Sequence, residues 1–310
     1  MSAVLQHVAE TSDVAKANDL AKTNGVAKAR AIVHRTRGET HGPITRLVSP
    51  SDLGEIIKPF VFLDIFEVPA SREPLFGWHP HSGIATLTVV HEGAASYEET
   101  TGRKGILSAG GVEWMRAGRG VWHTGSSVGE MTTRGFQLWV ALPAHLEHAP
   151  AQSRYLSAEE VPKSGSARVI LGTYAGASSV IPAPEGINYL DVSLQAGERW
   201  SYRPPAGHDV AWLAVSQGRV RAGEPVSAGG PVSAGEPVSA GELVVFEESA
   251  ADIAIQAESS ARFVLGSAVK HRHDLVTGRY SVHTSPAALR EGEREIRRIA
   301  GQLSEAGIIR

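Results

Sequence analysis

The stretch of chain that decides the fold runs from Gly77 to His123 and reads GWHPHSGIATLTVVHEGAASYEETTGRKGILSAGGVEWMRAGRGVWH. It opens with Gly77-Trp78-His79-Pro80-His81 and closes with Gly118-Arg119-Gly120-Val121-Trp122-His123. Between these motifs lie short runs of alternating or β-branched residues, each ended by a turn that contains glycine, such as Glu92-Gly93. The pattern predicts an antiparallel meander with a pair of histidines at one end and a third histidine at the other.

The paired histidines have a spacing that suits ligand binding. Side chains two residues apart on a strand leave the same face, so His79 and His81 are expected to point together and Pro80 to point away. A third imidazole from a neighbouring strand, His123, would complete three nitrogen ligands inside a small barrel, the usual beginning of a zinc, iron, nickel or copper site. The alternative is three polar residues that are hydrogen-bonded at the mouth of a barrel and bind no metal.

Composition limits the classes of function. The chain has 310 residues, of which 42% are hydrophobic and 20% charged, as in ordinary globular proteins. A formal net charge of -3 provides no field that would attract nucleic acid or an anionic membrane, so neither partner is expected. There is no cysteine, which leaves only nitrogen and oxygen ligands for a metal. No signal sequence or spanning segment is recognisable, and the predicted location is cytoplasmic.

Glycine turns, prolines and changes of hydrophobic period suggest how the chain is divided. A hexapeptide repeat, Gly-Glu-Pro-Val-Ser-Ala, indicates an expanded surface hairpin, and Ser285-Pro286 followed by apolar residues at helical spacing predicts a closing amphipathic helix. The predicted parts are a flexible tail (1–30), an N-terminal β-domain with the three histidines (31–145), a linker (146–162), a C-terminal β-domain (163–284) with its expanded hairpin (223–242), and the helix (285–310).

Several motifs carry a resemblance to a known family. They are Phe62-Leu63-Asp64-Ile65-Phe66, His79-Pro80-His81-Ser82-Gly83, Glu92-Gly93, Trp114-Met115-Arg116-Ala117-Gly118, Gly120-Val121-Trp122-His123 and Gly135-Phe136-Gln137-Leu138-Trp139-Val140-Ala141-Leu142-Pro143. Together they resemble pirin and the pirin-like proteins of the cupin superfamily, over roughly residues 30 to 300. The resemblance implies an all-β bicupin: two β-sandwich barrels that face each other, the N-terminal one carrying the metal, with the α-helix at the C-terminus.

The resemblance also implies a ligand set from which this chain departs. The family's metal is held by the two histidines of His-Pro-His, a third histidine, and a glutamate two residues later, which correspond here to His79, His81, His123 and Gly125. A second glutamate of the family corresponds to Ala85. Three neutral imidazoles leave the charge of a divalent ion uncompensated, so metal affinity and proton transfer are both expected to be weaker than with a carboxylate.

Three further residues are candidates for the pocket. Glu113 stands where the family often has glutamine, and it is expected either to reach the pocket or to lie outside it. Glu130, in the loop after His123, is a similar candidate carboxylate. Gln137 shares a strand face with Trp139 and is either a residue of the strand core or a hydrogen-bonding group in the pocket. The sequence assigns no catalytic residue.

Two functions remain open at this point. In the first, one divalent metal, with iron expected first and nickel, copper or zinc as alternatives, polarises a small aromatic, flavonoid-like substrate and dioxygen. The protein would then be a dioxygenase resembling quercetin 2,3-dioxygenase. In the second, the protein is a non-catalytic regulator that binds a protein partner, with or without metal, and the missing carboxylates favour this alternative.

Overall fold

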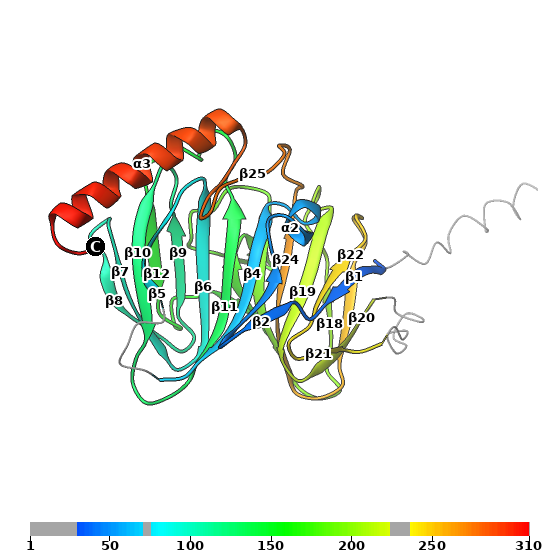
Figure 1. Ribbon diagram of the computed structural model, residues 1–310. Coiled ribbons are helices and arrows are strands. Elements are labelled where there is room, and N and C mark those ends of the chain that lie inside the picture. Colours follow the sequence, from blue (N-terminus) through cyan, green and yellow to red (C-terminus); the bar gives the residue numbers. More distant parts are fainter. Residues whose placement is uncertain (1–29, 71–75, 224–235, 310) are drawn as a thin grey trace, which may run out of the picture.

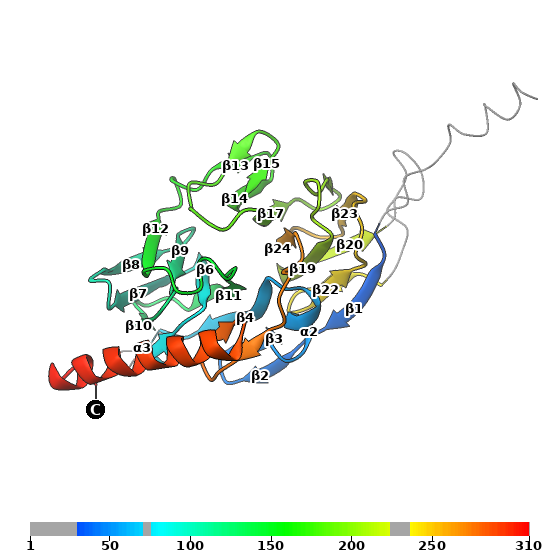
Figure 2. The same ribbon diagram turned by 90° about the horizontal axis from the view of Figure 1, so that it is seen from above.

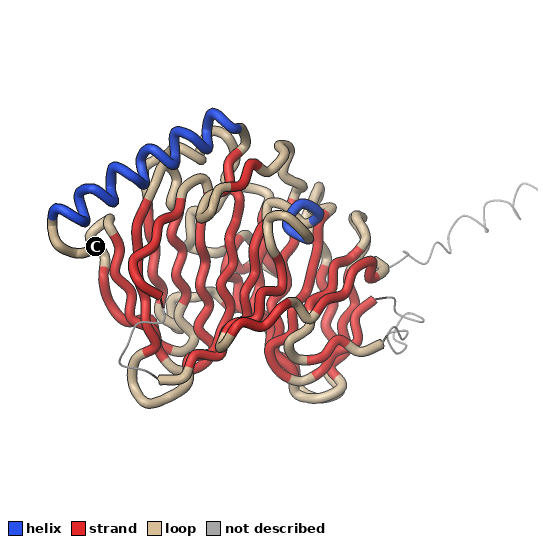
Figure 3. Tube along the Cα trace, in the orientation of Figure 1, coloured by secondary structure: helices blue, strands red, loops and turns tan. Residues whose placement is uncertain are grey.

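The computed structural model describes residues 30–70, 76–223 and 236–309. Figure 1 shows two β-bodies side by side, with helix α3 (Pro286–Glu305) lying across one end of the first. Strands and loops make up nearly all of the remainder (Figure 3). The predicted all-β architecture, with two sandwiches and a C-terminal helix, is confirmed. No helix within the described ranges is long and apolar enough to cross a membrane.

The N-terminal body is built from two antiparallel sheets. The larger has the strand order β12 (Gln152–Leu156), β9 (Val112–Arg116), β6 (Ile84–Glu92), β11 (Thr133–Ala141), β4 (Phe60–Val68), β3 (Ile44–Val48) and β2 (Glu39–His41). The smaller has the order β5 (Phe76–His81), β10 (Val121–Ser127), β7 (Ala94–Glu99) and β8 (Lys104–Ser108). The predicted meander from Gly77 to His123 thus supplies strands to both layers.

The C-terminal body repeats this plan. Its larger sheet has the order β1 (Ile32–Thr36), β22 (Leu243–Phe246), β19 (Val210–Gln217), β24 (Ala261–Ala268), β17 (Ile187–Leu194), β14 (Ala167–Leu171) and β13 (Lys163–Ser164). Its smaller sheet has the order β18 (Arg199–Tyr202), β23 (Ile253–Ala257), β20 (Arg219–Gly223) and β21 (Val238–Ser239). The remaining elements are α2 (Leu53–Ile56) and the pairs β15 (Thr173–Tyr174) with β16 (Ala177–Ser178) and β25 (Val276–Thr277) with β26 (Val282–His283).

Near two predicted domain boundaries, a strand pairs with a different part of the protein from the one to which the sequence assigned it. β1, which the division at residue 31 placed in the N-terminal domain, pairs with β22 of the C-terminal body. β12, within the predicted linker, pairs with β9 of the N-terminal body. The exact domain boundaries stay a prediction. The predicted tail lies outside the described residues except for Arg30, and so do residues 224–235 of the predicted hairpin, whose flanks β20 and β21 are paired.

The closing helix begins as the sequence predicts. The hydroxyl of Ser285 accepts a hydrogen bond from the backbone N–H of Ala288 at 3.1 Å, and Pro286 occupies the first turn. The buried residues of α3 include Ile299 and Leu303. Seen from above, α3 runs along the N-terminal body and not along the C-terminal one (Figure 2). The end of the chain therefore returns to the half that holds the histidines.

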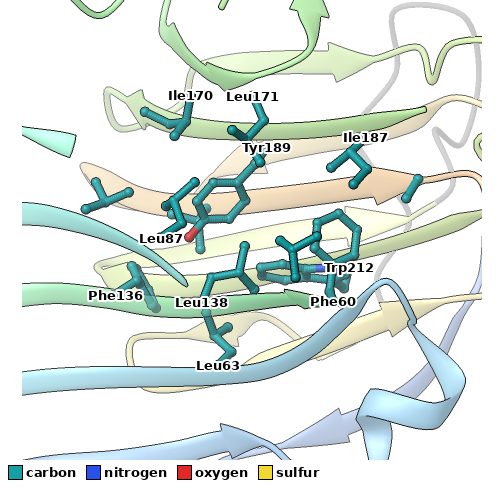
Figure 4. Packing of buried hydrophobic residues seen from close by; sticks show 14 of the residues in the cluster. Phe60, Leu63, Leu87, Phe136, Leu138, Ile170, Leu171, Ile187, Tyr189 and Trp212 are labelled. Atoms are coloured by element: carbon teal, nitrogen blue, oxygen red, sulfur yellow. The ribbon is translucent and has the colours of Figure 1, made fainter. Parts of the chain in front are cut away.

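The two bodies share one hydrophobic core. The larger sheets pack face to face, and Figure 4 shows Leu63, Leu87 and Leu138 of the N-terminal sheet opposite Tyr189 and Trp212 of the C-terminal sheet. Phe60 meets Trp212 edge-on, with ring centroids 5.4 Å apart. Since strand side chains alternate between faces, the residues between these apolar ones must point to the other side, into the N-terminal sandwich.

A buried ionic cluster joins the same two bodies. Asp191 of β17 is 1% exposed and accepts hydrogen bonds from Arg168 at 2.8 Å and from Arg262 at 2.7 Å. Nε2 of His91, from β6 of the other body, lies 3.4 Å from its carboxylate. Burial alone would raise the pKa of Asp191, but His91 and Arg262 outweigh it and hold that pKa well below its usual range.

We expect Asp191→Asn to lower the free energy of unfolding by about 3–5 kcal/mol at neutral pH, because the buried guanidinium groups lose their counter-charge. A group whose folded-state pKa is depressed stabilises the fold above its unfolded pKa and loses this effect as the pH falls. The difference between wild type and variant, measured by denaturant unfolding, should therefore shrink in acid. Asp252→Asn, in an exposed pair with Arg203, is the matched control and should change stability little. Equal stability of Asp191→Asn and wild type at neutral pH would contradict the prediction.

Candidate metal centre

Three histidines converge on the inner face of the smaller N-terminal sheet. β5 carries His79 and His81, and β10 places His123 directly opposite His79 in the antiparallel register. The ring centroids are 4.3 Å apart for His79 and His123, 5.1 Å for His81 and His123, and 5.1 Å for His79 and His81. One nitrogen from each ring lies within 4.8 Å of the others. The structure thus brings together the three residues that the sequence singled out, and their binding of a metal stays a prediction.

Hydrogen bonds orient two of the three rings. Nδ1 of His79 lies 2.9 Å from the carbonyl oxygen of Gly77, and Nδ1 of His81 lies 3.0 Å from that of Tyr280. A carbonyl oxygen only accepts, so both Nδ1 atoms carry the proton and each Nε2 atom has a lone pair of the kind that binds a metal. Nε2 of His123 is buried and has no hydrogen-bond partner. Carbonyl-oriented imidazoles beside an unsatisfied buried nitrogen are what a metal site requires.

The electrostatics of the cluster keep the rings neutral. Burial, with the neighbouring imidazoles, lowers the pKa of His81 to about 3 and that of His123 well below its usual value. Burial also lowers the pKa of His79. All three rings are therefore neutral at neutral pH, the form in which imidazole binds a metal. The donor set fits a divalent transition metal.

No carboxylate belongs to this group of ligand atoms among the described residues. Gly125 lies on β10 two residues after His123 and lines the same cavity, so a side chain there would face the histidines. Ala85 does not line the cavity and instead packs in the core shared by the two bodies. Only the departure at Gly125 therefore removes a carboxylate from the site itself.

The histidines form one wall of a cavity of about 590 Å³ inside the N-terminal sandwich. The opposite wall carries a row of polar residues that are successive cross-strand partners on β9, β6, β11, β4 and β3, namely Glu113, Thr88, Gln137, Asp64 and Arg46. Of the three predicted pocket candidates, Glu113 and Gln137 line the cavity. Glu130 is exposed and does not line it.

An aromatic pair lies beside the polar row. Phe62 and Trp139 are opposed on β4 and β11, and their rings stack with centroids 4.0 Å apart and planes within 6°. Trp139 also meets His81 edge-on at 4.9 Å, and the guanidinium of Arg46 lies over the Phe62 ring at 3.8 Å. The wall of the cavity next to the histidines is thus partly aromatic.

A segment near the C-terminus also contacts the residues around the histidines. Besides Tyr280, it contributes His283, whose Nδ1 lies 3.0 Å from Glu147 and whose Nε2 lies 3.0 Å from Ser82. Glu147, His148 and His283 form a second group of ligand-type side chains. Glu147 already accepts hydrogen bonds from the N–H and hydroxyl of Thr284 at 2.9 and 2.7 Å. These hydrogen bonds therefore hold the segment with His283 and Thr284 beside β5, the strand that carries His81.

Sequence reasoning missed several residues of the site. Thr88 and Asp64 had a usable signal, since each is a polar residue within a strand whose neighbours are apolar, whereas Arg46 follows another polar residue, Thr45. Phe62 and Trp139 were quoted only as parts of motifs. Tyr280 gave no signal, because its backbone carbonyl acts from a position far along the chain.

The fold and the site define the class of protein. Two β-sandwiches joined face to face, with a histidine cluster inside the first, make the chain a bicupin with a candidate metal centre. The Pirin family model matches residues 43–140. A pirin-like protein of Caulobacter vibrioides is 35% identical over 192 residues, which cover 57% of this chain and 67% of that protein. The chain therefore belongs to the pirin family, as its motifs predicted.

Other relatives carry the name of an enzyme. A Pseudomonas aeruginosa protein, named as a candidate quercetin 2,3-dioxygenase, is 38% identical over 189 residues, covering 56% of this chain and 65% of its own. The crystal structure of an Acinetobacter baumannii quercetin 2,3-dioxygenase has a TM-score of 0.73 at 23% identity, covering 87% of this chain and 95% of its own. A bacterial pirin from Escherichia coli, solved in complex with nickel(II), has a TM-score of 0.59 at 18% identity, covering 78% and 98%. At these identities, the structural likenesses show the shared fold.

We expect Gly125→Glu to raise the affinity for a divalent metal, because a carboxylate would then face the three imidazoles. A Cβ at this position would meet only the backbone oxygen of Ser96, at 3.0 Å, so the side chain fits with a small adjustment. The gain should be at least about tenfold, since even the hydrogen-bonding partners of ligands alter affinity by that factor. Calorimetric titration with Fe²⁺ or Ni²⁺ measures it.

Gly125→Gln is the matched control, because it adds the same volume without the charge. It should leave affinity close to that of wild type. If both variants bind metal as wild type does, position 125 does not face the metal.

Proposed function

We propose that His79, His81 and His123 hold one divalent metal, and that the protein uses it as a dioxygenase of the quercetin 2,3-dioxygenase kind on a small aromatic, flavonoid-like substrate. The observation that carries the proposal is the convergence of three neutral imidazoles, one with an unpartnered buried nitrogen, on a cavity with an aromatic wall. The names of the bacterial relatives support the same chemistry.

The ligand set restricts the choice of metal but does not determine which metal is bound. Imidazole nitrogens suit iron, nickel, copper and zinc alike, and we expect iron first because the reaction uses dioxygen. When bound, the ion would supply Lewis acidity and a template for the substrate and dioxygen. The nickel-bound relative shows that a bacterial pirin takes up a divalent ion.

The residues around the histidines would bind and orient the substrate. Phe62 and Trp139 give the cavity an aromatic wall against which an aromatic molecule would pack, and the contact of Trp139 with His81 brings that molecule close to the ligands. A cavity of about 590 Å³ lies within the range of small-molecule sites. The buried, apolar side of this cavity would also limit the access of water during the reaction.

A specific observation favours a second function. Without a carboxylate at position 125, the ligand set is less suited to retain a metal than that of the family. A protein that binds a partner, and in which an occupied or empty histidine site changes the binding surface, is the alternative to catalysis. No described feature identifies that partner.

We expect untagged wild-type protein to contain close to one metal ion per chain by elemental analysis, and His79→Ala and His123→Ala to lose it, because each removes one of three nitrogen ligands. The same variants should abolish dioxygen uptake with a flavonol, measured with an oxygen electrode. His273→Ala is the control, because this histidine is exposed and does not line the cavity, and it should alter neither result.

Two outcomes would overturn this reading. A wild type that stays empty after metal is supplied removes the proposed centre. A wild type that retains metal but oxidises no flavonol leaves the centre intact and moves the function to the partner-binding alternative.

A further inference from the structure

The polar row on the wall opposite the histidines contains three kinds of residue. At one end, Arg46 donates hydrogen bonds to both oxygens of Asp64, so these charges compensate each other. In the middle, Gln137 and Thr88 are neutral, and the Thr88 hydroxyl lies 3.1 Å from the Gln137 amide oxygen. At the other end stands Glu113, and no cation pairs with it among the described residues. The row thus ends in one uncompensated carboxyl group.

Glu113 is buried, with 7% of its surface exposed. Its Oε2 accepts a hydrogen bond from the Thr88 hydroxyl at 2.5 Å, whereas its Oε1 is buried and has no hydrogen-bond partner among the described residues. A buried polar atom without a partner is costly, and such atoms in cavities are commonly completed by a ligand. The unsatisfied oxygen belongs to a residue that lines the same cavity as the three histidines.

Neither of the nearby carboxylates offers the cavity a free acceptor oxygen as Glu113 does. Asp64 is engaged by Arg46, and Glu99 accepts hydrogen bonds from Ser153 at 2.8 Å and Tyr155 at 2.9 Å and does not line the cavity. Burial and then the charge of Glu99 raise the pKa of Glu113 to about 7, although Thr88 opposes this shift. Glu113 can therefore take up or release a proton near neutral pH, as a general base requires.

We propose that Glu113 is the proton acceptor of this cavity, and that it deprotonates an acidic phenolic or enolic hydroxyl of the bound ligand. The O–H bond of the ligand breaks, its proton moves to the Glu113 carboxylate, and the electron pair stays on the ligand oxygen. This inference rests on the proposed function for its ligand class, and it assigns a role that the histidines do not fill, because their nitrogen lone pairs would bind the metal.

The charged and titratable groups around Glu113 come from several elements. Glu99 and Tyr97 face it from β7, Tyr155 from β12, and the Arg46 and Asp64 pair from β3 and β4, with the histidines on the opposite wall. The only cation among the polar row, Arg46, is engaged by Asp64. Nothing in this surrounding set supplies a second free carboxylate to the cavity.

The test is the ionisation of a flavonol bound to metal-loaded protein without dioxygen, read from its absorption spectrum, since the anion absorbs at longer wavelength than the neutral form. Wild type should bind quercetin as the anion near neutral pH. In Glu113→Gln, we expect the pH at which bound ligand ionises to rise by at least about one unit, equivalent to a tenfold weaker acid. Glu113→Asp, which keeps a carboxylate, should restore part of the wild-type behaviour.

The controls separate a proton-accepting role from a structural one. Glu98→Gln makes the same change at an exposed position on β7 and should leave the spectrum unchanged. Glu113→Gln is expected to fold, because glutamine often stands at this place in the family, and its metal content should equal that of wild type.

The outcomes distinguish the inference from the proposed function. The same ionisation pH in Glu113→Gln and wild type, or no flavonol binding by the metal-loaded wild type, overturns the role of Glu113. If wild type consumes dioxygen with the flavonol while Glu113→Gln is spectrally and kinetically unchanged, the proposed function stands and the inference fails. If no dioxygen is consumed but the anion forms only with Glu113, the inference stands and the oxygenase function fails.

Discussion

The alternation of side chains along β6, β11, β4 and β9 is the constraint on which the rest of the structure depends. One face of these strands is apolar and packs on the C-terminal body through Leu87, Leu138 and Leu63. The other face carries the row from Glu113 to Arg46 and lines the cavity. A slip of one residue in register would exchange the two faces, exposing leucine to the cavity and burying carboxylates in the shared core. The same hydrophobic contact that joins the bodies therefore fixes the chemistry of the pocket.

The histidine cluster depends on parts of the chain that lie far apart in sequence. β5 and β10 supply the three rings, whereas the C-terminal segment supplies the Tyr280 carbonyl that orients His81. That segment is held in turn by the contacts of His283 with Glu147 and Ser82 and by α3 packed against β10. Because Ser82 directly follows His81, movement of the C-terminal segment would disturb both the backbone beside this histidine and the hydrogen bond of its ring.

Local pattern allowed much of this to be predicted. The His-x-His spacing, the glycine turns and the Ser-Pro helix start all act within a few residues, so the sequence contains the strand parity, the β-architecture and the beginning of α3. The position of Ala85 was harder to predict. A motif match placed a family carboxylate there at the site, but strand parity directs residue 85 to the shared core. The carbonyl of Tyr280 and the cluster around Asp191 arise only from tertiary packing, which no spacing in the sequence encodes.

The absence of a carboxylate at position 125 and the presence of Glu113 can be understood together. A ligand carboxylate would neutralise part of the charge of a divalent ion, whereas imidazoles alone leave that charge in place, and an uncompensated ion acidifies a bound hydroxyl more strongly. A hydroxyl that is already acidified needs only a weak base, and a buried glutamate whose pKa is raised to about 7 meets this need. In such a site, ligand and base are separate residues on facing sheets. Metal affinity and proton transfer could then vary independently, through Gly125 on β10 and Glu113 on β9.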